Sequence, residues 1–359
     1  VVGYLSQKLE KNGYSNLVPF IHFGLTSEDV NNTSYSLMFK RGIDGPLLES
    51  LNQLSSLLVL LVRKTKDMPM LSLTHGQPAT TTTLGKEIAV FHNRLERQIT
   101  YIKKHTLLAK FSGATGTFAA HKIAFPKESW TGFSDKFIRE MGLKNNPITT
   151  QIEPNDSIAE LLHAFVRINN ILTDMCVDIW LYISRNIFTQ TNKAGEVGSS
   201  TMPHKINPIS FENAEGNLEL SNASFVFLAS RISRSRLQRD LSGSTLFRNI
   251  GVAFGHSLLA YKNIITGLNR IQPNEDQLSS ELEGQWSILA EAIQTVLRKS
   301  GDKGAYNKIK KLTRGVALNQ ESYLALVESL DVADKDKKSL LNLTPSTYVG
   351  EIKKILKKY

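Results

Sequence analysis

The chain has 359 residues, of which 41% are hydrophobic and 21% charged, the composition of an ordinary globular protein. No run approaches the roughly 18 apolar residues of a membrane span, so we expect neither such a span nor a secretory leader. A single cysteine, Cys176, excludes an internal disulfide framework and favours a reducing, cytoplasmic compartment. The net charge of +10 leaves nucleic acid, a membrane surface or an anionic small molecule open as partners.

The first residues, "VVGYLSQKLEKNG", lack an initiator methionine and have the pattern of the middle or end of a helix. We therefore expect a preceding segment to be missing, with residues 1–20 as the remnant of an N-terminal domain. Pro273, in "NRIQPNEDQL", marks a second boundary. We predict a central helical-bundle domain over residues 21–270 and a smaller helical C-terminal domain over residues 271–359.

Apolar residues at helical spacing predict five long helices. They cover about 46–66, 84–108, 157–188, a stretch that begins near 208, and 250–268. The stripe in the third consists of Leu161, Phe165, Ile168, Leu172, Met175, Ile179 and Tyr182. The first has Leu47, Leu51, Leu54, Leu58 and Leu61 inward, and the fourth includes Phe211, Ala214 and Leu218. Strand-like alternation is scarce, so the pattern predicts an all-α fold with an elongated helical bundle.

Three segments rich in Gly, Thr, Ser and Pro interrupt these helices: 69–83, 112–128 and 190–208. The last contains "GEVGSSTMPHKINP", whose prolines and glycines fit a connector between helices. A connector does not explain the polar side chains that are crowded there: Ser199, Ser200, His204, Lys205 and Asn207. Hydroxyl, ammonium and amide donors together stabilise developing negative charge, so anion binding or proton transfer is the alternative.

Three further polar stretches each allow a structural and a functional interpretation. His75, in "LTHGQPATTTTLGKE", is either a hydrogen-bonding loop residue or a catalyst, and no partner at metal-ligand spacing accompanies it. In "HFGLTSEDVNN", helix capping explains Thr26 to Asp29, while a carboxylate or phosphate could also bind there. The stretch "RLQRDLSGSTLFRN" suits phosphate or is a solvated basic face. The residues alone indicate a helical cytosolic enzyme with an anionic substrate and no metal.

The stretch "GSSTMPHKINP" resembles the GSSxMPxKxNP loop of the fumarase/aspartase superfamily, with its spacing intact. More narrowly, "FIHFGLTSEDVNN", "THGQPAT", "TTQIEPND" and "QRDLSGSTLFRN" are similar to the bacterial-type branch of the adenylosuccinate lyase family. The similarity extends along essentially the whole chain. That family carries a His-Asp motif in its N-terminal domain, and by this comparison the sequence starts just after it.

The resemblance implies a lyase of purine nucleotide biosynthesis that needs no cofactor. It would release fumarate from adenylosuccinate, giving AMP, and from SAICAR, giving AICAR. A base removes a succinyl proton to form an aci-carboxylate carbanion, and an acid then protonates the leaving nitrogen. The family fold is a mostly helical protomer with a long central bundle, and four protomers form a homotetramer whose active sites each take residues from three chains.

The motif match assigns a role to each matched residue. Ser199 matches the base, His75 the general acid and Glu212 the carboxylate that orients this histidine. Lys205 and Asn207 match contacts to the substrate carboxylate that stabilise the dianionic intermediate. Thr26 and Ser27 match contacts to the succinyl carboxylate, and Gln151 matches a polar contact to the substrate. Arg239, Ser244 and Arg248 match the group that anchors the nucleotide, the last two at its 5′-phosphate. Ser200 is a further expected substrate-binding residue. His204 receives no role.

Other functions remain open at this stage. The nearest is another fumarate-releasing lyase of the superfamily, such as argininosuccinate lyase or fumarase. A catalytically inactive helical scaffold is an alternative of a different class. A binder of RNA or of a membrane surface would use the net charge of +10, but the aromatics and glycines expected of an RNA-binding sheet are missing, and we expect neither partner.

Overall fold

The computed structural model describes residues 1–191, 202, 205–313 and 318–359. The longer helices are α1 (Val2–Lys11), α2 (Ser27–Gly42), α3 (Leu48–Thr65), α4 (Leu84–Lys104), α6 (Trp130–Glu140), α7 (Asp156–Ser184), α8 (Ile209–Ile232), α9 (Ser242–Leu268) and α11 (Ala290–Lys299). The shorter ones are α5 (Ala119–Ala124), α10 (Glu275–Leu282), α12 (Ala305–Thr313), α13 (Gln320–Glu328), α14 (Asp334–Leu341) and α15 (Ile352–Ile355). The remaining helical segments are the 3₁₀-helices η1 (Ser15–Phe20), η3 (Trp286–Leu289) and η4 (Pro345–Thr347) and the π-helix η2 (Ile43–Leu47).

Among the described residues, strands are few, and each sheet contains two of them. Strands β1 (Pro69–Thr74) and β2 (Gln77–Thr83) form an antiparallel hairpin. Strands β3 (Leu108–Ala109) and β4 (Lys144–Asn145) pair in parallel, and β5 (Phe188–Gln190) pairs antiparallel with β6 (Ile271–Pro273). The predicted all-α fold is therefore confirmed.

The chain divides into two compact units, each built from three segments. Unit 1 comprises residues 1–53, 95–174 and 213–263, and unit 2 comprises residues 54–94, 175–212 and 264–359. Helices α3, α4, α7, α8 and α9 each contribute residues to both units. The domain boundaries expected near residues 20 and 270 stay a prediction.

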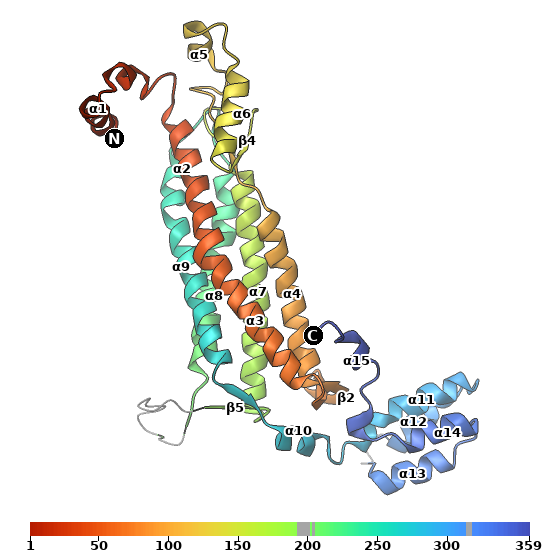
Figure 1. Cartoon of the computed structure of the whole chain (residues 1–359). Coiled ribbons are helices and arrows are strands. Elements are labelled where there is room, and N and C mark those ends of the chain that lie inside the picture. Colours follow the sequence, from red (N-terminus) through yellow and green to blue (C-terminus); the bar gives the residue numbers. More distant parts are fainter. Residues whose placement is uncertain (192–201, 203–204, 314–317) are drawn as a thin grey trace. The chain divides into compact units, whose positions relative to one another are not determined.

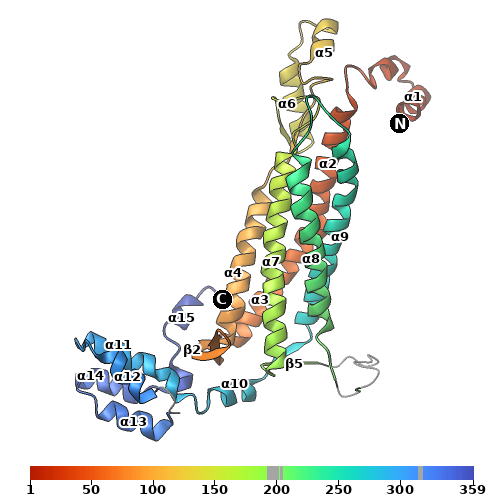
Figure 2. The same cartoon turned by 180° about the vertical axis from the view of Figure 1, so that it is seen from behind.

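In unit 1, the residues of α2, α7, α8 and α9 run side by side (Figures 1 and 2). Their core is aromatic: the ring of Phe254 lies 5.0 Å from that of Phe165 and 4.8 Å from that of Phe225, between centroids. The whole apolar stripe predicted for α7 is buried, because residues at steps of three and four share one face of a helix. Burial of these side chains is the main force that holds the helices together.

A neutral polar layer crosses this core. The Tyr261 hydroxyl donates to Asn169 Oδ1 at 2.8 Å, and Asn169 Nδ2 donates to the hydroxyls of Ser221 and Ser257 at 3.2 and 3.0 Å. All four side chains are fully buried, and burial raises the pKa of Tyr261. Because each member has a partner, the layer ties α7, α8 and α9 together in one register without an unsatisfied group.

Unit 2 contains the β1–β2 hairpin and a cluster of short C-terminal helices. The cluster packs around Leu289, Ile293, Tyr323 and Val327, and the Tyr323 hydroxyl donates to the carbonyl of Leu340 at 2.9 Å. The segment 69–83, expected as a loop, is instead the hairpin, in which Met70 pairs with Thr82. Its run of threonines suits a strand, because β-branched side chains fit an extended backbone.

Several predicted helix limits are wrong by a few residues. Helix α7 ends at Ser184 rather than 188, since Asn186 takes a left-handed backbone with φ of 60°. Helix α9 begins at Ser242 rather than 250, because Asp240 Oδ1 accepts from the Ser242 N–H at 2.7 Å. Pro46, expected to start a helix, lies in the π-turn that joins α2 to α3. Within α3, Val62 is fully buried and Leu61 only partly.

One helical stretch, residues 27–65, is by length and composition able to cross a membrane, since an 18-residue window within it has a mean hydropathy of 1.3, a feature that the sequence analysis did not predict. This stretch also supplies the core positions Leu51, Leu54, Leu58 and Val62, all fully buried. A core helix of a folded protein passes the same test of length and composition. The measure alone therefore does not assign this stretch to a membrane.

Candidate active site

The N-terminus of α2, in unit 1, is held by a capping box. The Thr26 N–H donates to Asp29 Oδ2 at 2.9 Å, the reciprocal bond of a capping box. Thr26 is half-buried and Ser27 is exposed at the first helical position. The predicted capping is thus present, and it holds both hydroxyl residues at the end of the helix that favours anions.

A buried ion pair joins this helix start to the glycine-containing loop that follows β3. Asp29 Oδ1 lies 3.0 Å from Lys110 Nζ and accepts from the Ser112 N–H at 2.9 Å. Lys110 Nζ also donates to the Gly113 carbonyl at 2.9 Å, and both charged side chains are fully buried. Burial lowers the pKa of Lys110, which the neighbouring Asp29 carboxylate opposes. The pair therefore fixes the α2 start against residues 112–113.

The imidazole of His121 fills the space beneath this junction. A Cβ atom on Gly24, whose φ is +65°, would lie 2.5 Å from His121 Nε2, so only glycine fits there. The ring packs 4.7 Å from Trp130 and 5.8 Å from Phe23, between centroids. In the described part of the chain neither ring nitrogen has a hydrogen-bond partner, and burial lowers the pKa of His121. The neutral ring therefore fills this space as an aromatic packing residue.

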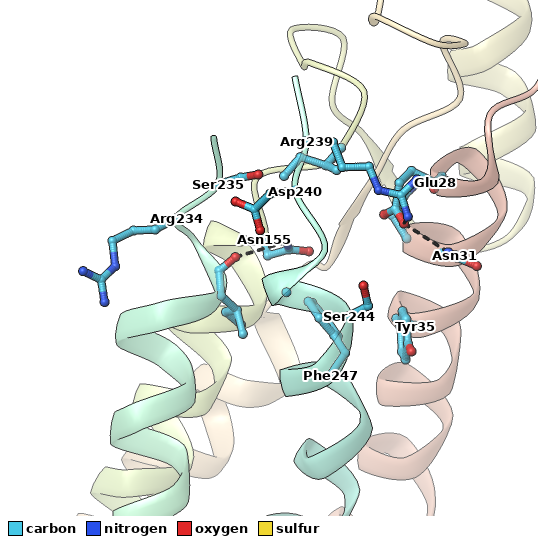
Figure 3. Close-up of a pocket in the computed structure, with 14 residues that line it drawn as sticks. Glu28, Asn31, Tyr35, Asn155, Arg234, Ser235, Arg239, Asp240, Ser244 and Phe247 are labelled. Carbon is cyan, nitrogen blue, oxygen red and sulfur yellow. Dashed lines mark hydrogen bonds and ion pairs between the residues drawn. The ribbon is translucent and has the colours of Figure 1, made fainter. Parts of the chain in front are cut away.

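Arg239 brings together residues that are far apart in the sequence. Its Nη1 donates to Ser27 Oγ at 2.8 Å and to Gln151 Oε1 at 3.2 Å, and its Nη2 lies 2.9 Å from Glu28 Oε1. Figure 3 shows the guanidinium reaching from the segment before α9 to the start of α2. Three predicted substrate-binding residues, Ser27, Gln151 and Arg239, thus meet at one place in unit 1.

The loop that carries Gln151 also contains Glu153, whose buried carboxylate holds the loop in place. Glu153 accepts from Asn146 Nδ2 at 2.9 Å and from the Asn155 N–H at 2.7 Å, and burial raises its pKa. Gln151 Nε2 donates to the Ala114 carbonyl at 3.0 Å. The side-chain oxygen of Gln151 is thereby turned toward Arg239.

A small pocket of about 70 Å³ lies beside the Arg239 cluster (Figure 3). Glu28, Asn155, Arg239 and Ser244 are among its lining residues. Ser244 lies in the first turn of α9, and its hydroxyl donates to the Leu241 carbonyl at 3.1 Å. The pocket thus combines polar side chains with the N-terminal end of α9, a combination that suits an anionic ligand.

Arg248, four residues after Ser244, lies on the same side of α9 but is exposed. It lines a neighbouring, largely apolar groove of about 560 Å³ in unit 1, together with Met38, Phe39 and Phe254. Ser244 and Arg248 are thus neighbours on one helix, but only Ser244 lines the pocket beside Arg239.

The residues predicted for acid catalysis lie in unit 2. His75 is exposed at the tip of the β1–β2 hairpin, where His75 and Gly76 have φ of 54° and 71°. Glu212 is exposed in the first turn of α8, and its Oε1 accepts from Trp180 Nε1 at 3.0 Å. Among the hydrogen bonds of the described residues, none joins Glu212 to His75. Their predicted pairing is not made within this single chain.

The serine-containing loop falls largely outside the described residues. Ser199, Ser200 and His204 are not described, so their predicted roles stay predictions. Lys205 is exposed, and its N–H donates to the Met202 carbonyl at 3.1 Å. Asn207 is half-buried. Gln190 Nε2 donates to the Ile206 carbonyl at 3.0 Å and holds the end of the loop near β5.

Sequence reasoning missed four residues that build this region: Glu28, Asn31, Lys110 and His121. "TSEDVNN" offered a signal for the first two, because the five polar residues that follow the cap exceed what capping requires. "AKFSG" offered none for Lys110, since a lone lysine is usually exposed. Among the described side chains, no group of three or more His, Cys, Asp or Glu could hold a metal ion.

The sequence matches two models of known families. The family described as Lyase matches residues 1–219, and the family described as Adenylosuccinate lyase C-terminal matches residues 235–349. The chain is 46% identical over 357 residues to the adenylosuccinate lyase of Legionella pneumophila (strain Corby), covering 99% of this chain and 78% of that protein. It is also 46% identical over 331 residues to the adenylosuccinate lyase of Escherichia coli (strain K12), covering 92% and 73%.

Solved structures share the fold at low sequence identity. A fumarate lyase from Mesorhizobium sp. BNC1 has a TM-score of 0.75 and 18% identity, covering 99% of this chain and 85% of that one. The 3-carboxy-cis,cis-muconate lactonizing enzyme from Pseudomonas putida has a TM-score of 0.77 and 19% identity, covering 99% and 80%. At this identity the likeness concerns the fold alone, and it agrees with the predicted fumarase/aspartase-like architecture.

Proposed function

The chain belongs to the adenylosuccinate lyase family, and from this premise we propose that it releases fumarate from adenylosuccinate and from SAICAR, giving AMP and AICAR. The observation that carries the proposal beyond family membership is the Arg239 cluster. One guanidinium there meets Ser27 and Gln151 beside a polar pocket. These are three of the residues that the motif match assigns to substrate binding, and no local sequence pattern requires them to meet.

Anchoring of the nucleotide falls to unit 1. Arg239 would contact the nucleotide, and Ser244 and Arg248 would bind the 5′-phosphate. Thr26 and Ser27 would bind the succinyl carboxylate at the N-terminus of α2. A substrate with two carboxylates and one phosphate carries about four negative charges at neutral pH, because the second pKa of a phosphate is about 6. The net charge of +10 and the exposed arginine on α9 favour such a ligand.

Proton abstraction falls to the serine-containing loop. Ser199 removes a proton from the succinyl carbon next to a carboxylate, and the electron pair left behind delocalises into that carboxylate. Lys205 and Asn207 stabilise the resulting dianion by charge and by hydrogen bonding. A serine hydroxyl is a weak base unless its alkoxide is stabilised, so this step depends on those neighbours and on the exclusion of water.

Departure of the leaving group needs an acid. His75 protonates the leaving nitrogen as the C–N bond breaks, and Glu212 orients the histidine. In a single chain His75 is exposed at a hairpin tip and Glu212 is exposed on α8. This supports our proposal that the two meet between subunits of a homotetramer, with each active site taking residues from three chains. The enzyme would work in the cytoplasm on its nucleotide substrates alone, without a nucleic acid or membrane partner.

The test is an assay of fumarate release from four compounds: adenylosuccinate, SAICAR, argininosuccinate and malate. We expect turnover of the first two only, because the arginine and serine residues around α9 suit a phosphorylated nucleotide. Turnover of argininosuccinate or malate at a comparable rate would contradict the proposed substrate class. Failure of the protein to turn over any of the four would contradict the proposed activity.

A further inference from the structure

Glu28 has a role in the structure that helix capping does not explain. Its Oε1 lies 2.9 Å from Arg239 Nη2 and also accepts from Asn31 Nδ2 at 3.0 Å. Both members of the ion pair are largely buried, with side chains 18% exposed for Glu28 and 21% for Arg239. Figure 3 shows Asn31, Glu28 and Arg239 in sequence along this edge of the pocket. A chain of two contacts therefore runs from α2 to the guanidinium.

The guanidinium is held at one end only. Two of its five N–H donors, both on Nη1, donate to Ser27 and Gln151, and Nη2 forms the ion pair with Glu28. No contact of the described residues uses Nε. Two hydrogen bonds and one ion pair thus fix the planar group. Its Nε edge is the one through which a guanidinium can bind a carboxylate or phosphate in two hydrogen bonds, from Nε and Nη2.

We propose that Glu28 is a positioning residue for substrate binding, which holds the Arg239 guanidinium so that its Nε edge meets the anionic nucleotide. Asn31 fixes the carboxylate, and the carboxylate fixes the guanidinium. The inference rests on the proposed function, because it takes Arg239 as a nucleotide contact. A side chain that is ordered before the ligand arrives loses less conformational entropy on binding, and this preorganisation raises affinity.

The same carboxylate also has an opposing effect. Its negative charge lies beside a pocket proposed for an anion, and like charges repel. If repulsion dominated, removal of Glu28 would tighten nucleotide binding. If positioning dominates, as we propose, removal loosens binding, and it does so only while Arg239 is present. The direction of the change and its dependence on Arg239 together separate the two effects.

The experiment measures AMP binding by titration calorimetry, together with KM and kcat for adenylosuccinate, for a set of variants. These are Glu28→Ala, Glu28→Gln, Arg239→Ala and the double variant Glu28→Ala/Arg239→Ala. We expect Glu28→Ala to weaken AMP binding and raise KM by about tenfold with kcat within about twofold, because uniform binding is lost. Glu28→Gln keeps an acceptor for Arg239 without its charge and should fall between Glu28→Ala and the parent. In the Arg239→Ala background, Glu28→Ala should change nothing further.

The matched control is Asp44→Ala, which removes another ion pair on the same helical stretch, that of Lys40 and Asp44 at 2.6 Å. It should leave AMP binding and KM unchanged. Unchanged or tighter AMP binding by Glu28→Ala would overturn the inference, and so would an equal loss in the Arg239→Ala background. If Arg239→Ala itself bound AMP normally, the proposed nucleotide contact would be at fault instead. Should Glu28→Ala not fold, normal AMP binding and KM for Glu28→Gln would equally overturn the inference.

Discussion

The two units differ in whether a single chain brings the proposed site residues together. In unit 1 the anchoring residues already meet: Arg239 contacts Ser27 and Gln151, and the buried pair of Asp29 and Lys110 fixes the helix they approach. In unit 2 the proposed acid, His75, is exposed at a hairpin tip, and Glu212 is bonded to Trp180 instead. Nucleotide anchoring can therefore be organised by one folded chain, whereas we infer that proton transfer requires assembly.

The largest effect that this comparison predicts is the loss of turnover without loss of binding. Ser199→Ala and His75→Ala should each lower kcat by about a thousandfold, because each removes a proton-transfer group. Their affinity for AMP, measured by calorimetry, should stay within a few fold of the parent, since the anchoring residues belong to unit 1. Steady-state kinetics of fumarate release give kcat. A normal kcat for Ser199→Ala would show that Ser199 is not the catalytic base.

The second prediction concerns the stability of the anchoring region. Lys110→Met leaves the Asp29 carboxylate buried without its counter-ion, which should lower the free energy of unfolding by about 3–5 kcal/mol. Lys40→Met is the matched control, because its ion pair with Asp44 is exposed and such pairs contribute about 0–1 kcal/mol. Urea denaturation followed by tryptophan fluorescence measures both. Equal losses for the two variants would show that the buried pair does not fix the α2 start.

The fold was largely predictable, because helical periodicity is a local signal. The α7 stripe from Leu161 to Tyr182 came directly from the spacing of apolar residues, and every member is buried. The β1–β2 hairpin was missed although its signals were present: a His75–Gly76 pair suited to a tight turn, followed by β-branched threonines. Helix ends depend on single hydrogen bonds, such as that of Asp240 to the Ser242 N–H, which periodicity does not contain.

The site was predictable only where a motif named its residues. Resemblance indicated Ser27, Gln151 and Arg239, and the structure brings them together over separations of 88 and 212 residues. Lys110 carries no local signal for its role, and the polar run around Glu28 does not name its partner, because burial of a lysine and pairing of a carboxylate with a distant arginine are products of tertiary packing. The pairing of His75 with Glu212 is a different case, since a single chain does not contain it.

A third prediction tests whether His75 and Glu212, which do not meet in a single chain, act together between subunits. If His75 and Glu212 of one site come from different chains, His75→Ala and Glu212→Ala proteins that are each nearly inactive should complement each other. Random mixing of subunits in equal amounts gives about one site in four with both residues intact, so about a quarter of the parent activity should return. The two proteins are unfolded together, refolded and assayed for fumarate release. No gain over the separate proteins would place both residues in one chain or remove one of them from catalysis.

The smallest predicted effect is a dependence of unit 1 stability on pH through His121. Burial lowers the pKa of this histidine in the folded state below its ordinary value of 6.5, and the nearby Asp29 carboxylate only partly opposes this. Below pH 6.5 the unfolded chain therefore binds a proton that the folded chain does not, and stability falls as the pH decreases, by up to about 1.4 kcal/mol per pH unit.

His121→Phe removes the titrating group and keeps an aromatic ring beside Trp130. The expected result is a shallower fall in stability between pH 6.5 and 5 for this variant, measured by urea denaturation at each pH. Because only the two slopes are compared, a constant packing cost of the larger ring does not affect the outcome, and equal slopes would mean that His121 is not buried in its neutral form.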